Sequence, residues 1–278
     1  MIRSTKPLLG TLLNNTHTLN SGLLACYMLQ EGAGIRINDS SFNQNNGTLT
    51  NASVNSLTSG WSGGQRGSVL FFDGSNDYIS LTGNKNLDNL NSSSFSFSFW
   101  VKSNESTPFT TAFIPFSRGY IGAGGIYGLA IELGSTYIQL LRNIGDAGYH
   151  YSQSTISYGS GWNHFVVIYD KAKLIHLHYK NGQSISLTIP GAAVSASNIG
   201  YNATYDSGFS IGAHRRNISD QYGKGYIDDL IIWNRVITPD EVMTLYYEPY
   251  SVFVKNKALD YGGLTFENPY QRRLFINM

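Results

Sequence analysis

The chain of 278 residues contains a single cysteine, Cys26, so it cannot form a disulfide within itself. This excludes the small secreted domains that depend on several disulfides for their stability. Cys26 lies in the apolar stretch LLACYML, which favours a buried and inert thiol over a reactive nucleophile.

Charged residues are also scarce, at 13% of the chain, and the formal net charge is +1 at pH 7. Proteins that bind nucleic acids usually carry a basic patch, so we expect no nucleic-acid partner. No stretch approaches the roughly 18 consecutive apolar residues of a transmembrane helix, and the N-terminus has no signal-peptide pattern. We therefore expect no membrane partner either.

Aromatic residues and glycine, by contrast, are abundant, with 19 Tyr, 14 Phe and 30 Gly. Aromatic side chains favour β-strands, and glycine favours the turns between them. In SFSFSFWVK, the residues Phe95, Phe97, Phe99 and Val101 alternate with polar or less apolar positions. This alternation predicts a half-buried antiparallel strand with one apolar and one polar face.

Similar short runs recur along the chain and are separated by turn residues. Asn181 and Gly182 stand between two such runs, which is a strong signal for a β-hairpin. Together the runs predict an all-β fold, a sandwich of two antiparallel sheets rather than a parallel α/β sheet. Further strands are expected at residues 23–29, 68–72, 77–81, 111–116, 126–132, 136–142, 208–212 and 225–235.

One short C-terminal helix is expected in the stretch TPDEVMTLYY. Thr238 is a typical N-cap residue, Pro239 suits the first helical position, and Glu241 completes a capping box. Pro249 follows and marks the end of the helix, because proline cannot continue a helical hydrogen-bond pattern.

The same patterns divide the chain into three parts. Residues 1–20 are interpreted as an extended N-terminal arm, and residues 21–248 as the sandwich domain. Residues 249–278 are rich in apolar side chains. We interpret them as a docking tail that binds this domain, a second copy or another protein.

Two adjacent aspartates, Asp228 and Asp229, interrupt the otherwise apolar stretch GYIDDLIIWNR. Neighbouring residues of a strand point to opposite faces, so regular alternation places Asp228 on one face with Leu230 and Ile232. Both faces are apolar, and a carboxylate against packed apolar surface is costly unless a partner neutralises it.

Four stretches occur in a fixed order along the chain: GLLACYMLQEGAGIRINDSSFNQNNGTL (22–49), LFFDGSNDYISL (70–81), FSFWVK (97–102) leading to GWNHFVVIYD (161–170), and GYIDDLIIWNRVITPDEV (225–242). Together they resemble the concanavalin A-like lectin/glucanase superfamily, in its laminin-G-like branch. The resemblance covers about residues 21–248 and implies a jelly-roll sandwich of two antiparallel sheets.

The resemblance also implies that the first carboxylate of the last stretch, Asp228, points inward and lies near a Ca²⁺ ion. The loop after the first strand would complete the site, because calcium takes six to eight oxygen ligands. The implied ligands are Asp39, Asn43, Asn46 and Asp228. Alternatively, Asp228 accepts hydrogen bonds from backbone amides or from Arg235, and Asp39 makes an Asx-turn.

Glucanases of this superfamily carry clustered acids on one strand, because their chemistry needs two carboxyl groups beside the scissile bond. No glutamate of this chain has an aspartate two residues later. Glu132 is the only glutamate well inside a predicted strand, and position 134 is a glycine. No HExxH, GxSxG or phosphate-binding loop occurs either, so we expect no enzymatic activity.

Two histidines, His176 and His178, lie two residues apart and share a strand face with Leu174 and Lys180. A pair with this spacing can bind zinc. The neighbouring residues favour a solvated or half-solvated strand face instead.

Two segments rich in tyrosine and polar residues, 117–128 and 143–162, are candidates for sugar binding. A tyrosine ring suits a surface that is part apolar and part wet, so it can stack on a sugar while polar neighbours bind the hydroxyls. The alternative is that these tyrosines pack beside turns at strand ends. The candidate ligand-binding residues are Tyr120, Tyr149, His150, Tyr151 and Tyr158.

The opening PLLGTLLNNTHTLNSG and the stretch LYYEPYSVF are similar to laminin-G-like proteins of tailed bacteriophages. The resemblance implies a non-catalytic virion surface protein, a fibre or head decoration, that binds a host-surface glycan. The alternatives are a purely structural component that docks other virion proteins, and a carbohydrate-binding accessory module of a polysaccharide-degrading system.

The expected location is the virion surface or, for a chain of other origin, the cell surface or extracellular space. Fibre-like proteins are often trimers, which favours a homotrimer.

Overall fold

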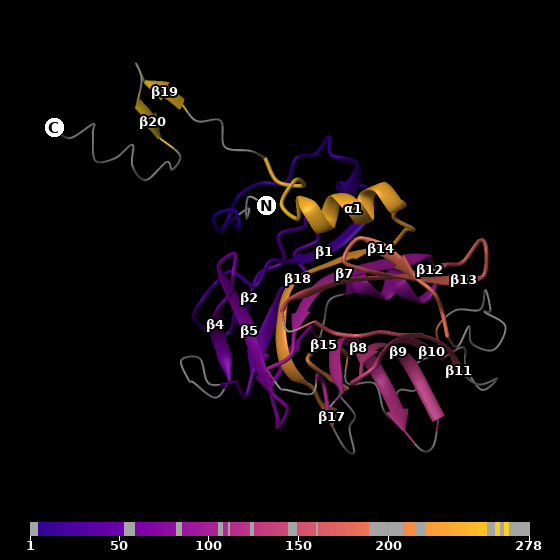
Figure 1. Ribbon diagram of the computed structural model, residues 1–278. Helices are drawn as coiled ribbons and strands as arrows, with labels where there is room; N and C mark the ends of the chain where they lie inside the picture. The colour runs from indigo at the N-terminus through magenta and orange to yellow at the C-terminus, as the bar shows by residue number, and fades with distance from the viewer. Residues whose placement is uncertain are drawn as a thin grey trace.

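The computed structural model describes residues 5–52, 59–81, 85–104, 108–110, 112–122, 125–143, 149–159, 161–188, 199, 208–214, 221–254, 259–261 and 264–266. These residues form two stacked antiparallel sheets, with α1 (Pro239–Tyr247) lying over one of them (Figure 1). The predicted all-β sandwich with one short helix is confirmed. In the described ranges, no helix is long and apolar enough to cross a membrane.

Sheet 1 has the strand order β14-β13-β12-β7-β18-β5-β4, and β1 pairs with β18 beside this path. Its strands are β1 (Leu23–Tyr27), β4 (Gly60–Gly63), β5 (Ser68–Asp73), β7 (Phe95–Lys102), β12 (Asn163–Asp170), β13 (Ile175–Lys180), β14 (Gln183–Ile185) and β18 (Lys224–Trp233).

Sheet 2 has the strand order β11-β10-β9-β8-β15-β6-β3-β2. Its strands are β2 (Arg36–Ile37), β3 (Gly47–Thr50), β6 (Tyr78–Ser80), β8 (Phe113–Gly122), β9 (Gly125–Leu133), β10 (Tyr137–Asn143), β11 (Tyr149–Thr155) and β15 (Phe209–Ile211). Smaller elements are the pairs β16 (Ala213–His214) with β17 (Gln221–Tyr222) and β19 (Leu259–Tyr261) with β20 (Leu264–Phe266), and the 3-10 helices η1 (Thr18–Asn20) and η2 (Lys85–Asn91).

The inner faces of the two sheets enclose the main core. Phe95, Phe97 and Phe99 of β7 are fully buried in it, as their alternation predicts. The ring of Phe97 lies 4.8 Å from that of Phe116 on β8, measured between centroids, so this pair joins the sheets. Burying each such side chain contributes about 1.5–3 kcal/mol.

The outer face of sheet 1 is also buried. Ser96 and Ser98, which the half-buried pattern places at the surface, are 0% and 2% exposed. The hydroxyl of Ser96 donates to the carbonyl of Arg235 at 2.7 Å, and that of Ser98 lies 2.8 Å from Nε2 of His164. The prediction of a half-buried strand is wrong because a second apolar layer covers this face.

This second layer consists of α1, the N-terminal segment and the residues after α1 (Figure 1). Leu13 forms a β-bridge with Phe253, so the two ends of the domain lie side by side. Residues from both segments thus contribute buried side chains to this layer, and the predicted borders of the arm and the tail stay predictions. The buried side chains of this layer include Leu13, Leu19, Val242, Leu245, Val252 and Phe253, which form one cluster with Trp233 of β18.

Two truncations test where the packed domain ends. A chain cut after Val254 should unfold at the same urea concentration as the full chain, because Phe253 is the last buried residue that the structure describes. A chain cut after Glu248 loses the side chains of Val252 and Phe253, and its free energy of unfolding should fall by about 3–6 kcal/mol. Equal stability of the two truncated chains, followed by tryptophan fluorescence, would contradict this border.

The histidine pair of β13 is buried, so the predicted solvated face is wrong. His178 lies between Ser152 and Ser154 of β11, with nitrogen-to-hydroxyl distances of 3.1 Å and 2.9 Å. It thereby joins sheet 1 to the edge strand of sheet 2. Burial lowers the pKa of His178 to about 3, so the ring stays neutral in the folded chain.

The buried histidine should make the fold sensitive to acid. Above pH 6.5, the approximate pKa of an unfolded histidine, the His178 ring is neutral in both the folded and the unfolded chain. Below that pH the ring binds a proton in the unfolded chain but stays neutral in the folded chain, so the unfolded state is favoured. We expect His178 to remove about 2 kcal/mol of stability between pH 7.5 and pH 5. In urea titrations between pH 7.5 and pH 5, the free energy of unfolding of His178→Gln should fall by about 2 kcal/mol less than that of the wild type. The control His17→Gln should lose as much stability as the wild type. An unchanged pH slope in His178→Gln is the contrary result.

Candidate functional site

The adjacent aspartates of β18 lie at a β-bulge. Asp228 pairs with Trp100 of β7, but the next pair joins Ile231 to Ser98, so β18 contains one extra residue at this point. Asp229 takes a φ of +47°, a conformation that aspartate adopts more readily than most residues, and accommodates the extra residue.

The bulge reverses the phase of the strand. Leu230 and Ile232 point into the main core. Asp228 lies opposite Trp100, whose two neighbours in β7 both point into that core, so both residues are on the outer face of sheet 1. Asp228 therefore does not share a face with Leu230 and Ile232, contrary to what regular alternation predicts, and the inward position that the resemblance implies for it is wrong.

Lys6 neutralises Asp228. Its ammonium group donates hydrogen bonds to the Asp228 carboxylate and to the carbonyls of Leu29 and Ser68, and only 4% of the lysine side chain is exposed. Burial and the neighbouring charge of Asp229 raise the pKa of Asp228, while Lys6 opposes this rise.

Arg66 neutralises Asp229. Its Nη2 lies 3.2 Å from Oδ2 of Asp229, and the hydroxyl of Tyr250 donates to the same oxygen at 3.0 Å. The guanidinium also lies 4.1 Å from the ring centroid of Trp100, a cation–π contact. Arg66 thus ties the turn between β4 and β5 to β7, β18 and the segment after α1.

The predicted calcium ligand Asp39 organises the loop after β1. Its carboxylate accepts hydrogen bonds from the backbone N–H groups of Cys26, Ser41 and Asn45, each at 2.8 Å, and from the Ser41 hydroxyl at 2.6 Å. Burial raises the pKa of Asp39, and these hydrogen bonds limit the rise. The bond from the Ser41 N–H is an Asx-turn, the alternative role expected for this residue.

The other implied ligands also have partners within the chain. Asn43 donates through Nδ2 to two backbone carbonyls of β1, and Oδ1 of Asn46 accepts from the backbone N–H of Asp39. Across the described ranges, no group of three or more His, Cys, Asp or Glu is arranged to hold a metal. A calcium ion at Asp228 would have to displace the ammonium of Lys6. The contacts fit neutralisation by protein groups, and the calcium prediction stays a prediction.

Removal of one partner tests the buried ion pair. In Lys6→Met the carboxylate of Asp228 keeps its buried position without a counter-charge, and the free energy of unfolding should fall by about 3–5 kcal/mol. Lys173→Met is the control, because that side chain is 73% exposed and its loss should cost less than about 0.5 kcal/mol. Urea unfolding that gives the same loss for both variants would exclude the proposed role of Lys6.

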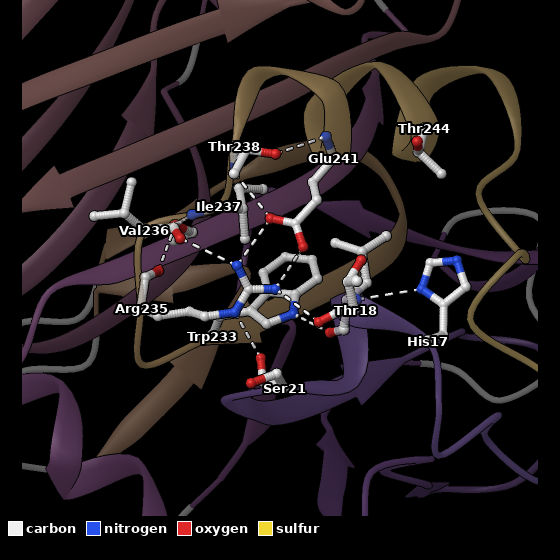
Figure 2. A network of polar contacts seen from close by, with 12 residues as sticks. His17, Thr18, Ser21, Trp233, Arg235, Val236, Ile237, Thr238, Glu241 and Thr244 are labelled. Carbon is white, nitrogen blue, oxygen red and sulfur yellow. Dashed lines mark hydrogen bonds and ion pairs between the residues drawn. The ribbon is translucent and has the colours of Figure 1, made fainter.

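A second polar network joins the start of α1 to the N-terminal segment (Figure 2). The guanidinium of Arg235 binds both carboxylate oxygens of Glu241, each at 2.8 Å, and donates to the carbonyl of Thr18 at 3.0 Å. The capping box predicted at Thr238 and Glu241 is confirmed. Arg235 thus holds α1, and the alternative in which it neutralises Asp228 is wrong.

A cleft of about 590 Å³ lies beside this network. The charges of Arg235 and Glu241 already neutralise each other in its wall. We therefore interpret the cleft as a consequence of how α1 is anchored. Its lining residues are Thr18, Ser21, Arg235, Thr238, Asp240, Glu241 and Thr244.

A third polar cluster lies on the outer face of sheet 2. Ile131 of β9 and Leu140 of β10 point into the main core, so their neighbours Glu132 and Gln139 point outward. In the sheet register Gln139 lies between Glu132 on β9 and Gln153 on β11. We call this cluster the Glu132 face and define it as Glu132, Tyr137, Gln139, Tyr151 and His214.

Glu132 is the centre of this face. Its carboxylate accepts a hydrogen bond from the Tyr137 hydroxyl at 3.0 Å and from Nε2 of Gln139 at 2.9 Å, and Nε2 of His214 lies 3.9 Å away. Burial raises the pKa of Glu132, but the contacts with His214, Gln139 and Tyr137 outweigh it and the pKa is lowered. Burial and the Glu132 charge raise the pKa of Tyr137 to about 12, so that hydroxyl remains a donor.

Tyr151 adds an aromatic surface to the same face. Its ring packs on Ala130 and Leu141 and remains half-buried. The outer face of sheet 2 therefore carries an ionised carboxylate on β9, an amide on β10 and, diagonal to that amide on β11, an aromatic ring. Hydrogen-bonding groups next to an apolar surface are what a sugar ring with its hydroxyls requires.

The other sugar-binding candidates are only partly described. Tyr149 pairs with Asn143 and His150 with Arg142 at the start of β11, and Tyr120 lies in β8. The side chains of Tyr120, Tyr149 and His150 lie outside the described residues, so their predicted roles stay predictions.

Tyr158 lies against the main core. Its hydroxyl donates to the carbonyl of Tyr137 at 3.1 Å, and its ring makes edge contacts with Phe109 and Phe165. This geometry matches the alternative interpretation for Tyr158, a tyrosine that packs beside a turn at a strand end.

Glu132, Gln139 and His214 were not among the residues predicted to bind a ligand. Alternation within YIQLLRN places Gln139 between the apolar residues Ile138 and Leu140, and this signal indicates an outward position. No local pattern brings His214 to Glu132, because their contact depends on β16 packing against β8.

Residues 73–243 match the family described as the concanavalin A-like lectin/glucanases superfamily, in its laminin-G-type branch, and the chain belongs to this family. No curated protein matches the sequence at a significant level. Family membership confirms the predicted jelly-roll class.

Two solved toxin domains have a similar fold: the binding domain of Paraclostridial Mosquitocidal Protein 1 and the receptor-binding domain of botulinum neurotoxin C/D mosaic serotype. Each has a TM-score of 0.58 and 14% identity, with 84% and 88% of this chain covered. This chain spans about half the length of both, 54% and 55%.

A third similar structure is domain 4 of AbnA, a GH43 extracellular arabinanase from Geobacillus stearothermophilus, in complex with arabinotriose. Its TM-score is 0.52 at 23% identity, with 81% of this chain and 98% of that chain covered. At these identities the three similarities establish the fold alone.

Proposed function

We propose that this chain is a non-catalytic binding module that recognises a glycan through the Glu132 face. The observation that carries the proposal is that Tyr151 lies on the same outer face as Glu132 and Gln139, diagonal to Gln139 on the neighbouring strand, on the sheet that α1 does not cover (Figure 1). The ring supplies an apolar surface, and the carboxylate and amide supply partners for sugar hydroxyls. The similarity to an arabinanase domain that holds arabinotriose supports a sugar ligand.

The carboxylate content of the Glu132 face supports binding without hydrolysis. The polar partners of Glu132 are a tyrosine, a glutamine and a histidine. Glycoside hydrolysis requires two carboxyl groups about 5–9 Å apart. The two similar toxin domains are likewise described as binding domains.

The finer form of the proposal is a virion surface protein, a fibre or head decoration, that holds a host-surface glycan. It rests on the likeness of the two ends of the chain to phage proteins. The toxin and arabinanase relatives support a surface or extracellular location. A homotrimer would present three Glu132 faces to one glycan surface and raise the overall affinity through multivalency.

A second candidate function is docking to other virion proteins. Apolar side chains are exposed where the N-terminal segment meets the start of the predicted tail, at Leu8, Leu9, Leu12 and Val254. The backbone N–H of Val254 donates to the carbonyl of Leu12, so these residues are neighbours. A protein partner would cover them.

A bacterial glycan array, followed by calorimetry with the best ligand, tests the first proposal. Tyr151→Ala and Gln139→Ala should each weaken binding roughly tenfold, which corresponds to about 1.4 kcal/mol. The matched controls Tyr247→Ala and Gln183→Ala change exposed residues on α1 and β14 and should bind like the wild type.

The same titration in calcium and in EDTA separates the alternatives. Binding that survives EDTA and falls only in the two Glu132-face variants supports the proposal. Binding that is lost in EDTA and unchanged in those variants would place the ligand near Asp39 and Asp228. If the protein binds no glycan on the array, either in calcium or in EDTA, docking to another virion protein remains as the proposed function.

A further inference from the structure

A shallow hollow lies at the free edge of sheet 1, away from the residues of the Glu132 face. Its volume is about 530 Å³, and β4, the outermost strand of the sheet, forms one wall. The lining residues are Gly32, Trp61, Ser62, Gly63, Gly64, Gly67 and Ser68.

Trp61 is held in place within this hollow. Its indole N–H donates to the carbonyl of Gly34 at 2.8 Å, and its ring packs against the main core while remaining half-buried. Another lining residue, Ser68, is held by Lys6, whose ammonium donates to its carbonyl. An aromatic ring in a fixed orientation loses little conformational entropy when a ligand binds to it.

The glycines determine the shape of the hollow. A Cβ at Gly64 would overlap the side chain of Val69, and a Cβ at Gly32 would lie 2.8 Å from the hydroxyl oxygen of Ser68. A Cβ at Gly63 would meet no atom within 4 Å, so the space in front of Gly63 is open. Gly32 and Gly64 therefore allow the chain to approach the side chains of Ser68 and Val69 closely, and the hollow has an open side at Gly63.

The lining chemistry limits the class of ligand. It offers an indole ring, two serine hydroxyls and glycine backbone, and no charged side chain. The nearby cations Lys6 and Arg66 are engaged with Asp228 and Asp229. A neutral ring with one apolar face and hydroxyls at its edge matches this lining, whereas a charged ligand would find no counter-charge.

We propose that this hollow is a second glycan subsite, which takes one uncharged sugar ring against Trp61. It shares no residue with the Glu132 face, so either site can bind when the other is removed. Two weak subsites on one module raise the overall affinity for an extended or clustered glycan, because the second contact is intramolecular.

The test follows the indole N–H resonance of Trp61 in the full chain labelled with ¹⁵N, assigned by its absence in Trp61→Phe. The probes are three neutral oligosaccharides, cellohexaose, maltohexaose and chitohexaose, at concentrations up to roughly 10 mM, above the dissociation constant of a weak contact. At least one should shift the Trp61 resonance in a saturable way. Tyr151→Ala should leave this shift unchanged, which separates it from the Glu132 face.

Gly63→Phe fills the open side of the hollow and should weaken the titration at Trp61 roughly tenfold or more. Gly161→Phe is the matched control, because a Cβ at Gly161 also meets no atom within 4 Å and the residue lies outside the hollow. Unfolding curves of both variants should match the wild type.

Three results would overturn the proposal. The first is a Trp61 resonance that none of the three oligosaccharides moves. The second is an equal loss of binding in Gly63→Phe and Gly161→Phe. The third is a Trp61 resonance that moves only with an extended peptide, which would make β4 an edge for strand pairing.

Discussion

The bulge at Asp228 and Asp229 is the constraint on which the outer layer of sheet 1 depends. The extra residue turns both carboxylates away from the main core, towards Lys6 and Arg66. Each cation comes from a segment far from β18 in sequence, so pairing fixes the N-terminal segment and the β4–β5 turn onto the central strand. A buried carboxylate without its partner lowers the free energy of unfolding by several kcal/mol, so the fold depends on both attachments.

That outer layer decides which surfaces remain for binding. The apolar residues of α1, the N-terminal segment and the segment after α1 close one face of the sandwich. The outer face of sheet 2 carries the Glu132 face instead, and the free edge at β4 carries the hollow beside Trp61. The two proposed glycan contacts thus lie on parts of the fold that the packing of the outer layer leaves open.

Much of the fold is predictable from local patterns, because strand alternation and helix capping depend on neighbours in sequence. The alternation in SFSFSFWVK identifies Phe95, Phe97 and Phe99 as core residues, and Thr238 and Glu241 mark the start of α1. Of the sugar-binding candidates whose side chains are described, Tyr151 lies on the proposed site and Tyr158 packs against the core. Composition alone cannot distinguish two such tyrosines, since the difference lies in what the neighbouring strands place beside each ring.

The sequence by itself determined the sandwich fold, the short capped helix and the family membership, because each depends on short-range patterns of apolar, polar and turn residues. Only the tertiary structure decided how Asp228 is neutralised, because the phase of β18 depends on a bulge that alternation does not reveal. It also decided that His178 is buried between two serines and that His214 meets Glu132. These contacts join residues far apart in the chain, and their geometry exists only once the two sheets and their covering segments have packed.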